Sequence, residues 1–578
     1  MTHQPPLTKP RNEMEGDECN AMDENLSNDG LDQARPIKIK RRGRRMIIGC
    51  LIAVAIIATV QQKAPANDHQ IANLITIVVM LILSLQVLWN LHWIAVREGK
   101  KWYVPLGCAG CIALAPYLFR FDGFSGEIIP QISFRIGGQT PARQVEDASS
   151  GSGQDMQEGD SSTKDPVRGI ALSDFPEFLG PERTGVIPTR QFGIPADASE
   201  IETLWNIGIG EGWASFAVVQ DRAITLEQRD QEECLTCYRL EDGELLWIVR
   251  HSSTHYNLFG GSGPRSTPSI QGEHVFAQGE NGRVWCVNWQ TGEVQWSVDL
   301  LELANWSKTD SEQAVSWGRS GSPLLIDNLC VLPFGGPNQL SESGRSLIAL
   351  STETGEVQWT AGSDQISYSS AMLLELGGIR QIVSVNERTI TGHRVEDGTQ
   401  LWSHSWIGQS NGGANCASVI PAGKDQFIIG KGYGGGSALV RVTTKDSGTQ
   451  TSEEIWTSSR VLKTKFTHAC VDGRTAYAIS NGALEAVNIA DGESHWTQPR
   501  KERLGQGQLL LAEDTLIGQF ESGGVLFAAA STDGFEVLCK LPAMRSKTWN
   551  IPTLAGRHLL VRNDRQAFCF LLPERKNR

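Results

Sequence analysis

Hydrophobic and polar residues alternate in short runs over the C-terminal two-thirds of the chain, and many of these runs meet at a glycine-containing turn. Alternation with a period of two is typical of β-strands, and a Thr-Gly or Asp-Gly step between two such runs is typical of a β-hairpin. Near-copies of one phrase, a turn followed by a strand that ends in tryptophan, recur at Trp247, Trp296, Trp359, Trp402, Trp456 and Trp496. This repetition indicates an array of similar units.

A second repeated feature gives the number of units. The chain repeatedly crosses a polar loop and enters a short run of small or apolar residues, and eight such runs begin at residues 215, 266, 320, 369, 416, 467, 508 and 550. Successive starts lie 41 to 54 residues apart. Four short strands fit this length, as in the blade of a β-propeller. We therefore predict an all-β, eight-bladed β-propeller of four-stranded blades over residues 171–574.

The last predicted blade is one strand short, and a spare strand precedes the first blade. Ile201–Trp205 ends in tryptophan, like the outer strand of the other units, but comes before the first inner strand. Without a partner it would leave an unpaired sheet edge. We predict that it completes the eighth blade and joins the two ends of the ring. Each tryptophan is expected to fill the seam between its blade and the next.

Three apolar segments precede the propeller, at 46–60, 71–96 and 102–119. Their length and composition predict about three transmembrane helices within residues 46–119. Basic residues lie before the first segment, at 38–45, and between the second and third, at 97–101. By the positive-inside rule both stretches are cytoplasmic. We expect a multi-pass protein of the inner (cytoplasmic) membrane with a cytoplasmic N-terminus and a periplasmic or extracellular propeller. A cleavable signal peptide is the alternative for the first segment.

Composition predicts two unstructured regions around these helices. Residues 1–45 contain an acidic, polar stretch and are expected to form a disordered cytoplasmic tail. Residues 120–170 include a stretch rich in Gln, Ser, Gly, Asp and Glu, and are expected to form a flexible linker. The formal net charge is −13, with no basic cluster outside the membrane flank, which argues against nucleic acid as a partner.

The 12 cysteines do not form a regular disulfide framework. Cys234 and Cys237 have C-x-x-C spacing, but no histidine follows, which excludes covalent c-type haem attachment there. A second pair that would complete a zinc site is absent from the nearby sequence. A disulfide between these two cysteines stays open as an alternative to two buried thiols.

The glycine-turn and tryptophan repeats resemble those of the quinoprotein family of eight-bladed propellers, which is named after pyrroloquinoline quinone (PQQ) dehydrogenases. The resemblance spans residues 171–574. Its opening, Phe178–Val186 followed by Trp205–Gly212, resembles the start of membrane-tethered bacterial members. The resemblance implies the fold; for function it allows either an enzyme or a non-enzymatic scaffold, because one fold supports several functions.

If the resemblance extended to the dehydrogenases of this family, it would imply a Cys-Cys disulfide, a stacking Trp, an Asp base and calcium ligands at the channel mouth. This chain has no Cys-Cys dipeptide and no Asp at the starts of the predicted inner strands. We therefore favour a membrane-anchored binding or scaffolding module for an extracytoplasmic protein or glycan partner, with no catalytic residue and no metal site assigned. The alternative is a PQQ-dependent dehydrogenase of alcohols or sugars, with PQQ and calcium as cofactors.

A ligand of a propeller is expected at the entrances of the innermost strands, because these converge on one channel mouth. Aromatic side chains there would stack on a planar ring or a sugar, and arginines would hold a carboxylate or phosphate. The alternative is that these side chains only fill and hydrate the channel. The predicted mouth residues are Trp213, Arg265, Arg319, Tyr368, Asn415, His468, Gln508, Trp549 and Asn550.

Overall fold

The computed structural model describes residues 29–63, 69–135, 174–335 and 346–575. Two predicted unstructured stretches, most of the acidic tail and the Ser-Gly-rich centre of the linker, lie outside the described residues. The chain divides into two compact units. The first comprises residues 1–58 and 77–109, and the second comprises residues 59–76 and 110–578.

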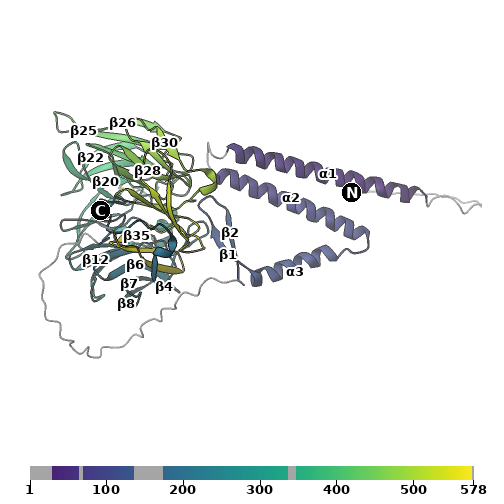
Figure 1. Ribbon diagram of the computed structural model, residues 1–578, viewed down its shortest axis with the longest axis horizontal. Helices are drawn as coiled ribbons and strands as arrows, with labels where there is room; N and C mark the ends of the chain where they lie inside the picture. The colour runs from purple at the N-terminus through teal and green to yellow at the C-terminus, as the bar shows by residue number, and fades with distance from the viewer. Residues whose placement is uncertain (1–28, 64–68, 136–173, 336–345, 576–578) are drawn as a thin grey trace, which may run out of the picture. The chain divides into compact units, whose positions relative to one another are not determined.

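Three helices precede the propeller: α1 (Asp29–Lys63), α2 (His69–Arg97) and α3 (Tyr103–Leu118) (Figure 1). The three predicted apolar segments are thus helical. Two helices, α1 within Met46–Lys63 and α2 along its whole length, are long and apolar enough to cross a membrane. The third, α3, has 16 residues, fewer than the ~20 that a typical bilayer requires. Helix α1 begins ahead of Met46, so part of the predicted disordered tail is helical.

A β-hairpin follows α3 directly, in the first part of the predicted linker. Its strands are β1 (Phe119–Phe124) and β2 (Pro130–Phe134), paired antiparallel. The prediction of a flexible linker from residue 120 was therefore wrong for this part. The sequence carries a short form of the strand-and-turn pattern, since Phe119 and Phe121 alternate with polar residues and the turn contains Gly126.

Eight blades follow, as predicted, and each contains four consecutive antiparallel strands; one of the eight sheets has a fifth strand in addition. Each blade runs from the inner to the outer strand. Blade 1 consists of β5 (Ala217–Val219), β6 (Arg222–Arg229), β7 (Glu232–Arg239) and β8 (Leu245–Ser252), and blade 2 consists of β11 (Ser269–Gln271), β12 (His274–Gln278), β13 (Arg283–Asn288) and β14 (Val294–Asp299). Blade 3 consists of β15 (Leu324–Ile326), β16 (Leu329–Pro333), β17 (Leu347–Ser351) and β18 (Val357–Ala361), and blade 4 consists of β19 (Met372–Leu376), β20 (Ile379–Val385), β21 (Thr389–Arg394) and β22 (Gln400–Ser405).

Blades 5 to 8 repeat the same order. Blade 5 consists of β23 (Ile420–Pro421), β24 (Gln426–Gly430), β25 (Ser437–Thr444) and β26 (Gln450–Ser458), and blade 6 consists of β27 (Ala469–Asp472), β28 (Thr475–Ser480), β29 (Ala483–Asn488) and β30 (Ser494–Thr497). Blade 7 consists of β31 (Gln508–Ala512), β32 (Thr515–Gln519), β33 (Val525–Ala529) and β34 (Val537–Leu541), and blade 8 consists of β35 (Thr553–Ala555), β36 (His558–Arg562), β37 (Gln566–Leu571) and β4 (Glu202–Gly208).

Short elements decorate the blades. They are the 3₁₀ turns η1 (Ala198–Glu200) and η2 (Arg500–Glu502), a small hairpin of β9 (Tyr256–Asn257) and β10 (Gly261–Ser262), the helices α4 (Leu300–Ala304) and α5 (Lys308–Ala314), and the strand β3 (Val186–Ile187). Strand β3 pairs parallel with the inner strand β31, which makes blade 7 five-stranded.

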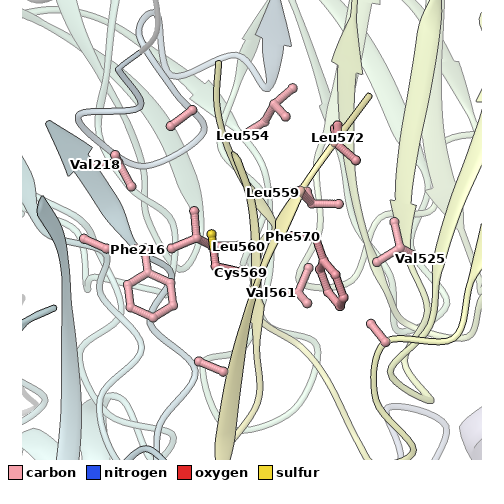
Figure 2. Packing of buried hydrophobic residues seen from close by; sticks show 14 of the residues in the cluster. Phe216, Val218, Val525, Leu554, Leu559, Leu560, Val561, Cys569, Phe570 and Leu572 are labelled. Atoms are coloured by element: carbon pink, nitrogen blue, oxygen red, sulfur yellow. The ribbon is translucent and has the colours of Figure 1, made fainter. Parts of the chain in front are cut away.

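The ring closes with a strand from its own beginning. Strand β4 pairs antiparallel with β37 along the register Gln566↔Gly208 to Leu571↔Glu202. The predicted closing role of Ile201–Trp205 is therefore confirmed. The last blade packs between its two neighbours, and Figure 2 shows Phe216 and Val218 of blade 1 on one side of Leu560 and Val525 of blade 7 on the other.

The tryptophans of the repeat fasten each blade to the next. The indole of Trp205 donates to the carbonyl of Leu240 at 2.8 Å, and a Cβ on Gly243 would come within 2.9 Å of the indole ring. Gly243 has a φ of 70°, so glycine is needed there both for the turn and for the close approach. The same Trp-to-glycine-turn contact recurs for Trp247 with Gly292, Trp296 with Gly355, Trp359 with Gly398 and Trp456 with Gly492.

Trp402 and Trp496 lack this contact with a glycine. The indole of Trp496 donates to the carbonyl of Ser531 at 2.7 Å, but a Cβ on Gly534 would meet nothing within 4 Å. For Trp402 the cause lies in the sequence. The equivalent turn of blade 5 lacks the Thr-Gly or Asp-Gly step, since residues 445–449 read Lys-Asp-Ser-Gly-Thr. The indole of Trp402 instead donates to Gln381 in its own blade at 2.6 Å, and it stacks on Phe427 of blade 5 at 5.8 Å between ring centroids.

A segment ahead of blade 1 crosses the ring at the far ends of the inner strands. Phe175 pairs with Val218 of blade 1, and Arg183 donates to the carbonyls of Ser322 and Pro323 at the start of blade 3. The segment ends in β3 beside blade 7. It contains the Phe178–Val186 stretch on which the family resemblance begins, so this stretch connects the inner strands of blades 1, 3 and 7.

Cys234 and Cys237 lie three residues apart on strand β7 and are free thiols. Residues at this separation on a strand point to opposite faces of the sheet, which keeps the two sulfur atoms apart. The alternative of a disulfide between them is therefore wrong.

Candidate ligand cavity at the propeller mouth

The inner strands surround a cavity of about 430 Å³. Its walls come from the loops that enter the inner strands of several blades, and Phe178 of the crossing segment also contributes. Ser125, Gly126 and Ile128, the tip of the β1–β2 hairpin, contribute at the mouth. Two segments that precede the propeller in the sequence thus contribute to the cavity wall.

The hairpin tip is held by hydrogen bonds from several blades. The backbone N–H of Gly126 donates to the Glu521 carboxylate at 2.5 Å, and the same carboxylate oxygen accepts from the Trp549 indole at 2.8 Å. The ammonium group of Lys465 lies 3.4 Å from the carbonyl of Gly126. Ser125 and Gly126 are buried. The hairpin tip therefore occupies part of the mouth.

Ion pairs hold the sides of the hairpin. Arg565 donates to Asp122 at 2.7 Å, and Arg503 lies 3.2 Å from Glu127. Partial burial alone would raise the pKa of Asp122, but hydrogen bonds from Ser133 and Arg565 and the positive charges of Arg565 and Arg120 together lower it. A depressed carboxyl pKa means that the folded state stabilises the ionised form. Docking of the hairpin therefore depends on charge as well as on shape.

Six of the nine predicted mouth residues line the cavity. They are Trp213, Arg265, Tyr368, His468, Gln508 and Trp549. Aromatic pairs form among the lining residues. The two with the shortest separation are Trp213 with Trp549, with centroids 4.9 Å apart, and Tyr368 with Trp317, stacked at 4.9 Å. Whether these residues bind a ligand stays a prediction.

Three predicted residues are held inside the walls instead. Arg319 is 2% exposed and donates to the carbonyls of Pro333 and Phe334. The amide of Asn415 donates to Asn386, Glu387 and Trp406, and that of Asn550 donates to Ala214 and Gly212. Each of these side chains satisfies backbone carbonyls of loops, and each is a structural residue in this geometry.

Sequence reasoning missed most of the hydroxyl groups and several aromatic residues of the lining. These include Ser215, Thr267, Ser320, Ser370, Ser418, Thr467, Trp317, Tyr433 and Phe466. The available signal was their position, because the hydroxyl residues lie in or next to the inner-strand starts. The hairpin tip had no such signal, since it lies outside the repeats.

The lining is nearly neutral. Arg265 is held by the carbonyls of Gly260 and Gly263 at 2.8 Å and by the buried carboxylate of Glu280 at 3.2 Å. Burial lowers the pKa of His468 to about 4, so its imidazole is uncharged at neutral pH. Burial likewise lowers the pKa of Lys547, whose ammonium group lies over the rings of Trp213 and Trp549 at 5.0 and 4.3 Å.

Behind Arg265 a second carboxyl group is buried beside Glu280. Glu233 accepts the backbone N–H of Glu280 at 2.7 Å, and burial raises its pKa to about 7 from an ordinary 4.5. The folded state therefore binds a proton more tightly than the unfolded state. Tighter proton binding by Glu233 therefore contributes to the free energy of unfolding. The contribution is complete below pH ~4.5 to 5 and is lost as the pH rises through 7.

We expect Glu233→Gln to reduce the pH dependence of stability, to which Glu280 and Glu485, whose pKa values burial also raises, contribute as well. In the unaltered protein, thermal melting temperature should fall between pH 5 and 8, with a contribution of up to about 3 kcal/mol from this group. The variant should be more stable than the parent at pH 8 and similar at pH 5. Glu232→Gln, at the neighbouring position where the side chain is partly exposed and pairs with Arg250, is the control and should keep the parental slope. Equal slopes for parent and Glu233→Gln would contradict the assignment.

The residues of the cavity do not fit a calcium-bound quinone. Among the described residues that line it there is no Asp or Glu, whereas Ca²⁺ is held by carboxylate and carbonyl oxygens. Within the described ranges no group of three or more His, Cys, Asp or Glu has an arrangement that could hold a metal ion. PQQ itself carries several carboxylates, and Arg265 already pairs with Glu280.

Comparison with known proteins gives one family match. The sequence model of a family described as outer membrane protein assembly factor BamB matches residues 197–336 and 306–538. No curated protein matches the chain. Among solved structures, BamB from Moraxella catarrhalis is 12% identical, with 65% of this chain and 99% of that chain covered and a TM-score of 0.45. Quinohemoprotein alcohol dehydrogenase from Comamonas testosteroni is 12% identical, with 70% and 81% covered and a TM-score of 0.49.

Proposed function

The chain belongs to the BamB family of PQQ-type propellers, and on that premise we propose that it is a membrane-anchored, extracytoplasmic binding or scaffolding module for a protein or glycan partner. The observation that carries the proposal is the mouth cavity: a nearly neutral space lined by aromatic and hydroxyl groups. Such a lining suits binding better than redox chemistry with a calcium-bound cofactor.

We propose the domain boundaries 1–45 for a cytoplasmic tail, 46–119 for three transmembrane helices, and 171–574 for the propeller. Within residues 120–170, the hairpin replaces the first part of the linker. Basic residues flank α1 at its N-terminal side and lie between α2 and α3, and this supports a cytoplasmic position for both.

Contacts within the second unit support three membrane crossings. Gln70 and Asn73, at the start of α2, donate to the carbonyls of Gly126 and Glu127 at 2.8 Å. The start of α2 is therefore on the same side of the membrane as the hairpin tip. If α2 crosses the membrane, its C-terminal end lies on the opposite side from the hairpin. The chain can then return to the hairpin only if α3 also crosses the membrane.

Aromatic residues compensate for the shortness of α3. Trp102 and Tyr103 lie at its N-terminal end, and Tyr117 and Phe121 lie at or beyond its C-terminal end, all of them exposed. Aromatic residues in such positions are typical of the two interfaces of a membrane.

A reporter fused after residue 578 tests the location. Alkaline phosphatase, which is active only outside the cytoplasm, should be active in that fusion, and β-galactosidase should be inactive. The reverse pattern would overturn the extracytoplasmic assignment. Fusions after Lys100 should give the opposite pair of results.

Site-specific photo-crosslinking tests the binding role. Leu258, exposed in the β9–β10 hairpin between the lining residues Asn257 and Phe259, should crosslink in membranes to a defined extracytoplasmic protein or glycan. Val357, similarly exposed at the start of the outer strand β18, is the control and should not. Equal yields at both positions would contradict a binding role of the mouth.

The PQQ-dependent dehydrogenase is the second candidate function. Titration of the full chain with PQQ and calcium, followed by absorbance and melting temperature, separates the two. We expect no saturable shift. A saturable shift would favour the enzyme and call for assays with alcohols and sugars.

A further inference from the structure

The hairpin of β1 and β2 is amphipathic, and its apolar face is the exposed one. Phe119 pairs with Phe134 and Phe121 pairs with Ile132 across the two strands, so these four side chains lie on one face. Their exposed fractions are 38% for Phe119, 70% for Phe134, 51% for Phe121 and 64% for Ile132. These four residues are called the outer face of the hairpin below. In a soluble protein, such a face packs against the core.

The opposite face of the hairpin is polar and makes the ion-pair contacts with the propeller. Asp122 is hydrogen-bonded to Ser133 within the hairpin and accepts from Arg565 of the propeller at 2.7 Å. Arg120 lies 3.4 Å from the same carboxylate. The side chain of Asp122 is 12% exposed. The hairpin thus turns its polar face to the propeller, and the described residues leave its outer face exposed.

The hairpin begins where the apolar helix α3 ends. Helix α3 runs to Leu118, and β1 starts at the next residue. The backbone N–H of Arg135, directly after β2, donates to the carbonyl of Leu118 at 2.9 Å. The base of the hairpin is therefore fixed to the end of the helix. This continuity favours the membrane that α3 is proposed to cross as the partner of the outer face.

The length of α3 places the base of the hairpin at the membrane boundary. Its 16 residues rise about 24 Å, whereas the hydrocarbon core of a bilayer is ~30 Å thick. A crossing helix of this length does not extend beyond the headgroups, so Phe119 and Phe134 lie at their level. A two-stranded sheet is excluded from the hydrocarbon itself, because its edges carry unpaired backbone groups. Aromatic side chains favour the boundary between headgroups and acyl chains.

We propose that the outer face of the hairpin is a lipid-contact surface, which lies at this boundary on the extracytoplasmic side of the membrane. The inference rests on the proposed membrane anchoring by α3 and goes beyond it, because it assigns a partner to the hairpin. The tip of the hairpin lines the cavity, and β1 has six residues. At ~3.3 Å per residue, the propeller mouth is thus held within about 20 Å of the membrane surface. Partners of the mouth are therefore recruited close to the membrane.

Photo-crosslinking in vesicles tests the lipid contact. Benzoylphenylalanine, which inserts into C–H bonds on illumination, replaces Phe134 or Ile132 in the full chain. The purified protein is reconstituted in phosphatidylcholine vesicles with a radiolabelled phosphatidylcholine tracer. Tyr117, exposed near the end of α3, is the positive control, and Val357 on the outer strand β18 is the negative control. Lipid labelling at Phe134 and Ile132 should approach that at Tyr117 and exceed that at Val357 by about tenfold or more.

A matched pair of variants tests whether the outer face acts as a unit. Phe121→Ser combined with Ile132→Ser makes one cross-strand pair polar, and lipid labelling from position 134 should fall by about threefold or more. Phe121→Leu combined with Ile132→Leu keeps the pair apolar and should retain labelling within about twofold. Because both side chains are more than half exposed, neither variant should shift the melting temperature in detergent by more than about 2 °C.

Three results would overturn the proposal. The first is labelling at Phe134 and Ile132 no higher than at Val357 while Tyr117 reacts with lipid. The second is crosslinking from Phe134 to a protein, including a second copy of the chain, instead of to lipid, in the vesicles or in native membranes. The third is equal labelling in the serine and leucine variants. All three leave the membrane anchoring standing, whereas no lipid labelling at Tyr117 or at the hairpin would remove the anchoring by α3 together with the proposal.

Discussion

Replacing β4 by a glycine-serine segment of equal length is expected to abolish cooperative melting of the propeller. The replacement leaves the edge of β37 unpaired and removes Trp205 and Ile207 from the core between blades 8 and 1. Loss of a buried tryptophan alone costs about 3 to 5 kcal/mol, and the lost strand pairing adds to it. Calorimetry of the full chain should show a melting temperature lowered by more than 10 °C or a broad transition.

A rescue distinguishes ring closure from general damage. The register pairs Leu571 with Glu202, so residues 202–208 appended after Leu571 through a short turn would reach the same edge as a hairpin. We expect this addition to restore most of the lost stability in the replaced protein. Parental melting without β4, or no recovery after the addition, would contradict closure by this strand.

Gly126→Ala is expected to release the hairpin from the mouth. A Cβ at this position would lie 2.5 Å from Cγ of Gln506 and 2.9 Å from Cζ of Phe466, closer than side chains tolerate without displacement. The hairpin should open, and amide hydrogen exchange over residues 119–134 should become at least tenfold faster. The blades should keep their melting temperature, because the hairpin adds no strand to them.

Two further variants make this result interpretable. Gly110→Ala in α3, where a Cβ would meet nothing within 4 Å, should leave exchange unchanged. Arg565→Gln removes the partner of Asp122 without touching the hairpin sequence and should also accelerate exchange, by a smaller factor. Unchanged exchange in both Gly126→Ala and Arg565→Gln would show that these contacts do not hold the hairpin.

The eight-bladed ring could be predicted from the sequence because each blade repeats the same local pattern of strands, turn and tryptophan. Five tryptophans, from Trp205 to Trp456, pack on the glycine turn of the following blade, so a spacing of residues reports a contact between blades. The closing strand followed from counting, since Ile201–Trp205 was left over and blade 8 lacked one strand. The hairpin was missed because it occurs once, and because what fixes it is a set of partners such as Glu521 and Arg565, hundreds of residues away.

The site was predicted in position but not in orientation. Arg319, Asn415 and Asn550 stand at inner-strand entrances, as expected, but point into the walls; their neighbours Ser320, Cys416 and Ile551 line the cavity. Successive residues of an extended chain point to opposite sides, so an error of one residue exchanges wall for cavity. Only the hydrogen-bond partners, which the sequence does not give, decide between the two.

The docked hairpin also competes with any partner that binds at the mouth. Because hairpin and propeller belong to one chain, docking of the hairpin is intramolecular, and its effective concentration depends on the length of the segment that joins them. Even weak contacts such as those of Gly126 and Asp122 then suffice to keep the mouth covered most of the time. A partner competing for the same surface binds with an apparent affinity reduced by the fraction of open molecules. Affinities measured on a propeller stripped of residues 119–134 would therefore exceed those of the intact protein.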